Sequence, residues 1–177
     1  MNNEEETLKP RIYVACLAAY NNGILHGDWI DADRSEDEIY EEIQKILKSS
    51  PIDGAEEFAI HDYDDFYEAE LSEYPGIETV AKVGEFLAEH GRLGAKVFNR
   101  CCHDLEEARE MMEERYIGAY EKLQDYVREY IEECWDDFPQ YIEPYFDYDR
   151  FGEDLEMNGV VETLKVSFEQ VHIFRGA

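Results

Sequence analysis

Hydrophobic residues alternate with polar ones in some segments of the chain and recur every three or four residues in others. The first pattern predicts strands near both ends, and the second predicts helices between them. Residues 11–18 form a β-branched and aromatic run, and residues 25–32 fit a second short strand. The turn signal Asn21-Asn22-Gly23 lies between them, which indicates a hairpin with a slightly long loop. Residues 57–63 alternate between polar and apolar positions and predict a third strand.

A helix with a clear start lies between the second and third predicted strands. Ser35 and Glu38 have the spacing of a capping box, in which the Ser35 hydroxyl accepts the Glu38 amide while Glu38 reaches back. Apolar residues then recur at helical spacing on one face, namely Ile39, Ile43, Ile46 and Leu47. Residues 10–64 are therefore predicted to form a small α+β domain.

The middle and last thirds add helices and a second set of strands. An amphipathic helix is predicted to open at Glu78 and to break at Gly91 and Gly94, with short helices over 94–101 and 104–114. In the last third, a strand is predicted at 116–120 and a helix at 121–136, followed by short helices around Tyr141–Phe146 and Phe151–Leu155 and a hairpin of 160–167 with 170–175. The residues expected on the inward face of the helix at 121–136 are Leu123, Val127, Tyr130, Ile131 and Cys134.

These elements predict an α+β fold with small antiparallel sheet modules at both ends and a helical module between them. We expect three modules, an N-terminal one at 1–66, a central helical one at 67–114 and a C-terminal one at 115–177. Acidic charge is concentrated in both end modules and not in a single tail.

Composition narrows the function classes. The 177 residues include 44 Asp and Glu against 16 Lys and Arg, so the net charge is -28. Duplex phosphates and anionic lipids would repel such a surface, which argues against direct nucleic-acid binding and membrane docking. Without a secretory signal or an apolar run of ~20 residues, we expect a cytoplasmic protein with reduced cysteines. An aromatic content of 14% favours a folded core over disorder.

Motifs for catalysis and metal binding are incomplete. Loops beginning at Asp62 and Asp147 resemble calcium loops, but the first lacks glycine at its sixth position and the second lacks an acidic twelfth residue. Cysteine and histidine do not have zinc spacing. Cys16 and Cys134 lie on apolar faces, which predicts small buried side chains. With no nucleophile elbow or phosphate-binding loop either, we expect no enzyme activity and no cofactor.

Carboxylates recur every three or four residues on two predicted helices, those at 104–114 and 121–136. Residues four apart on a helix lie about 5–6 Å from each other, which is similar to the spacing of phosphates on one DNA strand, about 6–7 Å. Each such like-charge pair costs a few tenths of a kcal/mol. The pattern is either a plain solvated acidic face or a surface that gives up stability in order to bind something.

An ordered set of short motifs resembles one known family over about residues 11–175. The motifs are Ile12-Tyr13-Val14-Ala15, Tyr20-Asn21-x-Gly23, Gly27-x-Trp29, the run 57–63 (EFAIHDY), and Tyr148-x-Arg150-Phe151-Gly152-x-Asp154-Leu155-x-x-x-Gly159. In this set the chain is similar to the ArdA antirestriction proteins of conjugative elements.

The resemblance implies an elongated three-module α+β protein that dimerises through its C-terminal module. It also implies a curved acidic surface that imitates duplex DNA and occupies the DNA groove of type I restriction–modification enzymes, contacting their DNA-binding and methyltransferase subunits. The carboxylates expected to stand in for phosphates are Asp28, Asp31, Glu41, Glu42, Asp62, Asp64, Asp65, Glu106, Glu110, Glu113, Glu114, Glu121, Asp125, Glu129, Glu132, Glu133 and Asp136.

The expected contact of the homodimer lies in the apolar-richest parts of the C-terminal module, which are the final hairpin and the aromatic stretch with Tyr141, Tyr145, Phe146 and Phe151. Two other function classes stay open at this point. One is a generic acidic interaction module that needs no DNA shape. The other is an acid–base or metal enzyme without a recognisable motif, since 44 carboxylates guarantee that some lie close together.

Overall fold

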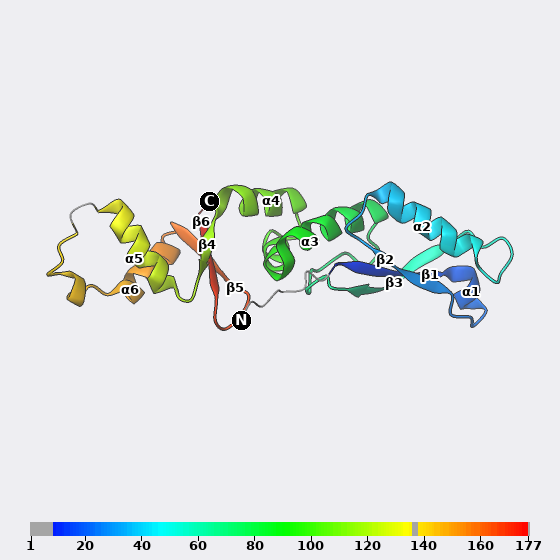
Figure 1. Ribbon diagram of the computed structural model, residues 1–177, viewed down its shortest axis with the longest axis horizontal. Helices are drawn as coiled ribbons and strands as arrows, with labels where there is room; N and C mark the ends of the chain where they lie inside the picture. The colour runs from blue at the N-terminus through cyan, green and yellow to red at the C-terminus, as the bar shows by residue number, and fades with distance from the viewer. Residues whose placement is uncertain (1–8, 136–137, 177) are drawn as a thin grey trace, which may run out of the picture. The chain divides into compact units, whose positions relative to one another are not determined.

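The computed structural model describes residues 9–135 and 138–176, and its contacts divide the chain into two compact units. Unit 1 comprises residues 1–105 and unit 2 comprises residues 106–177. Each unit contains one three-stranded antiparallel sheet, and a helical region lies between the two sheets in the sequence. The predicted α+β fold class is confirmed (Figure 1), while the division into three modules stays a prediction.

Unit 1 is built on a sheet with the strand order β2-β1-β3. Its strands are β1 (Arg11–Cys16), β2 (Gly27–Asp31) and β3 (Phe58–Asp64), and its helices are α1 (Leu17–Asn21), α2 (Glu36–Lys48) and α3 (Ile77–Arg100). Helix α2 packs against β1 and β2 and contacts α3. The hairpin of β1 and β2 is present, but the predicted first strand ends at Cys16 because the connection to β2 folds into α1.

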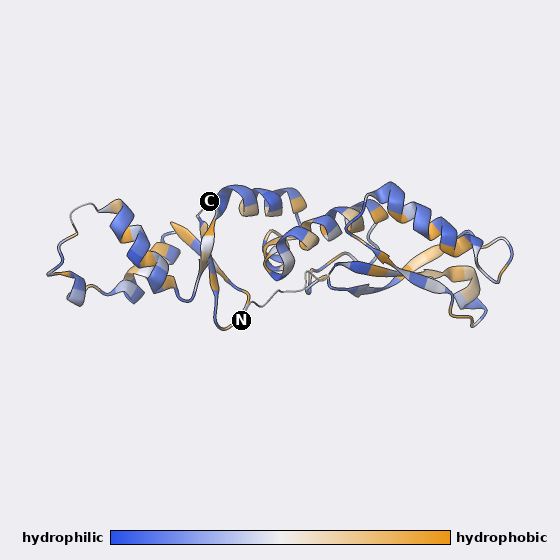
Figure 2. Cartoon of the chain, viewed as in Figure 1, coloured by the Kyte–Doolittle hydropathy of each residue, from blue (hydrophilic) through white to orange (hydrophobic). Residues whose placement is uncertain are grey.

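The start of α2 follows the local sequence. The Ser35 hydroxyl accepts the Glu38 amide and Glu38 accepts the Ser35 amide, so the predicted capping box is formed. The apolar face predicted for this helix is buried, and Figure 2 shows the rest of α2 as hydrophilic. Burial of this face anchors α2 to the sheet, since Ile39 and Ile43 are fully buried.

Helix α3 bends where the sequence predicts a break, at one glycine and not at two. Gly91 has φ 54° and ψ -139°, a conformation that side chains with a Cβ rarely adopt. Gly94 does not break the helix, so that prediction is wrong. Gly94 is closely surrounded by other side chains of α3, because a Cβ added to it would lie 2.7 Å from the Cβ of His90 and 3.3 Å from Cε1 of Phe86. Close packing within unit 1 therefore explains Gly94, and backbone conformation explains Gly91.

Unit 2 carries the second sheet, with the strand order β4-β6-β5. Its elements are α4 (Leu105–Glu110, which starts at the unit boundary), the π-helical turn η1 (Met111–Arg115), β4 (Tyr116–Tyr120), α5 (Leu123–Cys134), the 3₁₀ turn η2 (Glu143–Tyr145), α6 (Tyr148–Met157), β5 (Val161–Lys165) and β6 (Val171–Arg175). Helix α5 packs on α6, on β4 and on β6, and the predicted terminal hairpin of β5 and β6 is confirmed.

One prediction for unit 2 is corrected. Cys134 is exposed and not buried, and it is the last residue of α5, at the end of the helix. Asp147, the first residue of the incomplete calcium-type motif, precedes α6 as its N-cap, and its Oδ1 accepts the amide of Arg150 at 3.0 Å. Within the described residues, none of the helices is long and apolar enough to cross a membrane.

Candidate functional site: acidic surfaces on both units

Most of the carboxylates predicted to imitate phosphates face solvent. Asp136 lies outside the described residues. Of the other sixteen, twelve are exposed and four are half-buried, namely Asp31, Glu42, Asp64 and Asp65. All four half-buried residues belong to unit 1. The predicted set is therefore accessible to a partner, most completely in unit 2.

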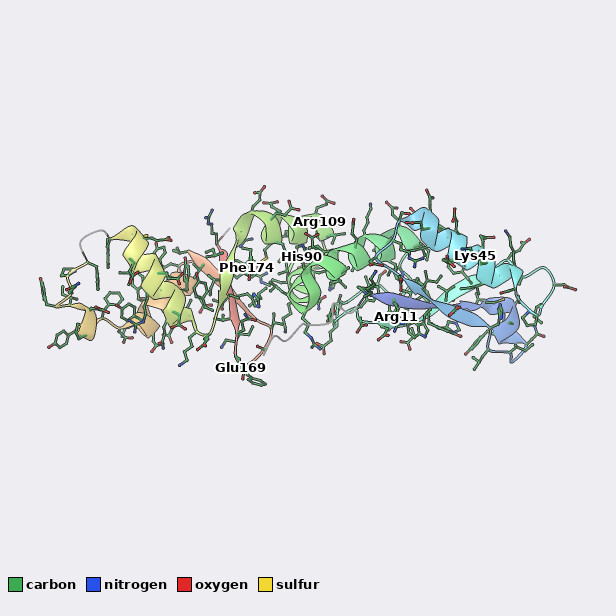
Figure 3. All side chains as sticks on the ribbon, viewed as in Figure 1. Arg11, Lys45, His90, Arg109, Glu169 and Phe174 are labelled. Atoms are coloured by element: carbon green, nitrogen blue, oxygen red, sulfur yellow. The ribbon has the colours of Figure 1, made fainter. Side chains whose placement is uncertain are left out.

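Basic residues neutralise part of the set in unit 1. Arg34 lies 3.0 Å from Asp31, and Lys45 lies 2.8 Å from Glu42. Arg11 pairs with Asp64 at 2.5 Å. The side chains of these pairs are 31–66% exposed, so each pair contributes about 0–1 kcal/mol to stability, but each also removes a net negative charge from the surface. Lys45 and Arg11 can be followed in Figure 3.

Other predicted carboxylates of unit 1 have no basic partner in the described chain. Asp28 and Glu41 are exposed, as is Asp62, and Asp65 is half-buried. Among the residues that the structure describes, no Lys or Arg pairs with any of these four. These four members of the predicted set lie on β2, on the solvent side of α2, and on β3 or directly after it.

The acidic stretch at the start of unit 2 is not one continuous α-helical face. Glu106 and Glu110 are four apart on α4 and lie on one side of it. Glu113 and Glu114 fall in the π-helical turn η1, whose wider turn shifts the direction of successive side chains. All four are exposed, but the even spacing predicted over 104–114 is lost at Met111.

Helix α5 carries the most regular acidic stripe. Asp125, Glu129 and Glu133 follow each other at four-residue spacing, and Glu132 lies beside them. All four side chains are exposed, while Tyr126, Val127 and Ile131 on the other side are buried in the core of unit 2. None of the four carboxylates pairs with a Lys or Arg of the described chain. We call these four residues the α5 stripe.

Hydrogen bonds hold the first half of the α5 stripe in place. Asp125 accepts the backbone amide of Lys122 at 3.1 Å, and Glu129 accepts the Tyr120 hydroxyl at 2.8 Å. Burial, and then the neighbouring Glu129 carboxylate, raise the pKa of Tyr120 to about 12. Tyr120 therefore stays protonated near neutral pH and continues to donate to Glu129, which fixes the carboxylate without neutralising it.

A second acidic group in unit 2 was missed by the sequence analysis. Asp149, Glu153 and Glu156 lie on α6 at spacings of four and three residues, the same signal that identified the stripe on α5. With Glu121, just before α5, they line a cavity of about 460 Å³, which Lys122 and Lys165 also border. This spacing is visible in the sequence, but it extends over only two turns of a short helix and is therefore a weaker signal than the stripe on α5.

The aromatic stretch expected to form the dimer contact divides into two groups. Phe146 and Phe151 are half-buried and pack against the core of unit 2, with their ring centroids 5.4 Å apart. Tyr141 and Tyr145 are exposed, at 77% and 87%. Within residues 9–135 and 138–176, no three or more His, Cys, Asp or Glu residues are grouped so that they could hold a metal ion.

Comparison with known proteins gives one family. The sequence matches the family described as "Antirestriction protein (ArdA)" over residues 12–170, which is most of the 177-residue chain. The match covers the sheet of unit 1 apart from Arg11, covers β4 and β5 of unit 2 but not β6, and includes the α5 stripe. A comparison with curated proteins finds no match.

Proposed function

Because this chain belongs to the ArdA family of antirestriction proteins, we propose that it inhibits type I restriction–modification enzymes by imitating duplex DNA in their DNA-binding groove. The family implies an antirestriction function. The observation that supports the DNA-mimic mechanism best is the α5 stripe, four exposed carboxylates at helical spacing without a cationic partner in the described chain.

The energetics of the stripe fit a binding surface. Like charges at four-residue spacing destabilise a helix by a few tenths of a kcal/mol per pair, so α5 is held by its buried side and not by its surface. A DNA-binding groove is rich in Lys and Arg, and these residues gain from a dense array of fixed negative charge. A partner of that kind offsets the repulsion that the isolated protein tolerates.

The proposed partner surface is the groove formed by the DNA-binding and methyltransferase subunits of the restriction enzyme. We further propose that the active form is a homodimer whose contact includes Tyr141 and Tyr145, the exposed members of the aromatic stretch. Large exposed aromatic side chains are common at protein–protein contacts, where one face of the ring is buried against a partner.

A competition experiment tests the mechanism. A purified type I enzyme is bound to labelled duplex DNA and titrated with this protein at several salt concentrations. We expect competitive displacement that weakens steeply as salt rises, because the attraction is between charged surfaces. Inhibition of cleavage while the DNA stays bound, or displacement that ignores salt, would contradict DNA mimicry. The first result would favour a generic acidic interaction module instead.

A further inference from the structure

One face of the unit 1 sheet combines aromatic rings with carboxylates. Alternate residues of a strand share a face, and β1 is paired on both sides. Arg11 and Tyr13 of β1, each with its paired residues on β2 and β3, therefore form two rows across one face of the sheet. The buried Ile12 and Ile30 lie on the opposite face. We call these six residues the Trp29 face: Asp31, Arg11 and Asp64 in the first row, and Trp29, Tyr13 and Asp62 in the second.

The first row shows how this face holds a guanidinium group. The Arg11 Cζ lies 5.5 Å from the centroid of the Trp29 ring, and its Nη2 donates to Asp64 Oδ2 at 2.5 Å. The Arg11 side chain is 42% exposed, whereas the next residue, Ile12, is fully buried on the other face of β1. A cation on an aromatic ring with a carboxylate beside it is therefore an arrangement that this surface already forms within the chain.

The second row has two rings and one carboxylate but no cation of its own, and the cation over its Trp29 ring is Arg11 of the first row. Tyr13 and Trp29 meet edge to face, with ring centroids 5.5 Å apart, and 38% of Trp29 remains exposed with Arg11 in place. Asp62 is exposed, and no Lys or Arg of the described chain pairs with it. Gly27 keeps the rings in position, because a Cβ there would lie 3.0 Å from Tyr13 Cζ and 2.4 Å from the Val14 carbonyl oxygen.

We propose that the Trp29 face binds arginine side chains of a cationic protein partner, with a guanidinium on the Tyr13–Trp29 pair and in contact with Asp62. Only the choice of partner rests on the proposed function, in which this surface meets a DNA-binding groove. Arginine is favoured over lysine because its planar guanidinium stacks on rings and presents a fork of donors to carboxylates. A surface that acts through charge alone treats the two cations alike.

Direct binding of two matched peptides tests the proposal. Labelled peptides of nine arginines and nine lysines are titrated with the protein at the same salt, and binding is followed by fluorescence anisotropy. We expect the arginine peptide to bind more tightly, and Trp29→Leu to reduce that preference by about two- to five-fold while leaving the lysine affinity unchanged. Trp29→Phe keeps part of the preference because it keeps a ring.

A matched control and a second readout guard against simple loss of folding. Tyr74 is 86% exposed in the same unit, and Tyr74→Leu should leave the preference unchanged. Trp29 and Trp135 are the two tryptophans of the chain, so Trp135→Phe leaves Trp29 as the only indole emitter. In that variant the arginine peptide should change the Trp29 emission more than the lysine peptide does. Equal responses, or a preference that survives in folded Trp29→Leu, would overturn the proposal.

The outcomes also separate this proposal from the proposed function. A protein that prefers arginine through Trp29 but fails to displace duplex DNA from a type I enzyme would retain the arginine site and lose the DNA-mimic mechanism. Salt-dependent displacement of DNA without any Trp29-dependent preference for arginine would retain the DNA-mimic mechanism and rule out the arginine site.

Discussion

The two units carry the same kind of sheet but treat their acidic charge differently. Unit 1 has 24 acidic and 9 basic residues, and unit 2 has 20 and 7 in a shorter segment. In unit 1, Arg11, Arg34 and Lys45 each contact a carboxylate of the predicted surface. In unit 2, the α5 stripe has no such partner within the described chain.

The hydrophobic cores of the two units also differ, in size and in how completely their side chains are buried. Unit 1 buries many aliphatic side chains and Phe86 completely, whereas the core cluster of unit 2 is smaller and is completed by half-buried rings such as Tyr130, Phe146 and Phe151. Unit 2 thus combines the denser charge with the less enclosed core. Because apolar burial stabilises a fold and unpaired like charges repel, we expect unit 1 to be the more stable of the two units.

The largest effect is expected from truncating the core of unit 1. Phe86 is fully buried, so Phe86→Ala should lower the free energy of unfolding of unit 1 by about 3–5 kcal/mol. Phe151→Ala should destabilise unit 2 by less, about 1–3 kcal/mol, because Phe151 is half-buried. Urea unfolding measures both, followed by the emission of Trp29 in Trp135→Phe and of Trp135 in Trp29→Phe.

Separate single-tryptophan signals are needed here because two units need not unfold in one step. Equal losses in the two units, or a larger loss for Phe151→Ala, would contradict the view that the core of unit 1 is the more enclosed one.

Neutralising the α5 stripe should have the next largest effect, on inhibition and not on folding. Changing all four residues to Asn or Gln should weaken displacement of DNA from a type I enzyme by tenfold or more, while any single change should cost about 1 kcal/mol or less. Glu42→Gln in unit 1 is the matched control, because Glu42 already pairs with Lys45. A single stripe residue whose loss abolishes inhibition would point to a specific catalytic or binding role instead.

Salt should stabilise both units, and unit 2 more. Repulsion among unpaired carboxylates is screened over a Debye length of ≈ 8 Å at 0.15 M. We expect the melting temperature to rise by several degrees between low salt and about 0.5 M, with the larger rise in the Trp135 signal. A flat response in unit 2 would mean that its carboxylates are paired or too far apart to repel one another.

The smallest effect concerns one buried histidine of unit 2. His172 is 8% exposed on β6, its Nδ1 lies 3.0 Å from the Tyr116 hydroxyl, and burial lowers its pKa below the usual value. The unfolded chain therefore binds a proton before the folded chain does, and His172 should cost stability as pH falls below about 6.5. His172→Gln should reduce the loss between pH 7 and 5 in the Trp135 signal and leave the Trp29 signal unchanged.

Local rules predicted the elements that depend on neighbouring residues. The capping box of Ser35 and Glu38, the buried face of α2 and the bend at Gly91 all formed as predicted, because helix starts, helix faces and left-handed backbone are set within a few residues. Two predictions from the same local rules failed. Gly94 stays within α3, because a single glycine costs a helix only about 1 kcal/mol and need not end it. Cys134 has the spacing of the buried face of α5 but is exposed as the last residue of that helix.

The amino-acid sequence is enough to show that the chain is strongly acidic, that its carboxylates recur at helical spacing, and that it resembles an antirestriction family. Net charge and the spacing of residue types follow from the order of the residues and need no coordinates. The tertiary structure is needed to show which carboxylates are paired with a cation: Asp64 contacts Arg11 on the neighbouring strand, while Asp62, two residues earlier, contacts no Lys or Arg in the described chain. Strand pairing sets such distances between residues that are far apart in sequence, and therefore it also sets where Tyr13 and Trp29 come together beside Asp62.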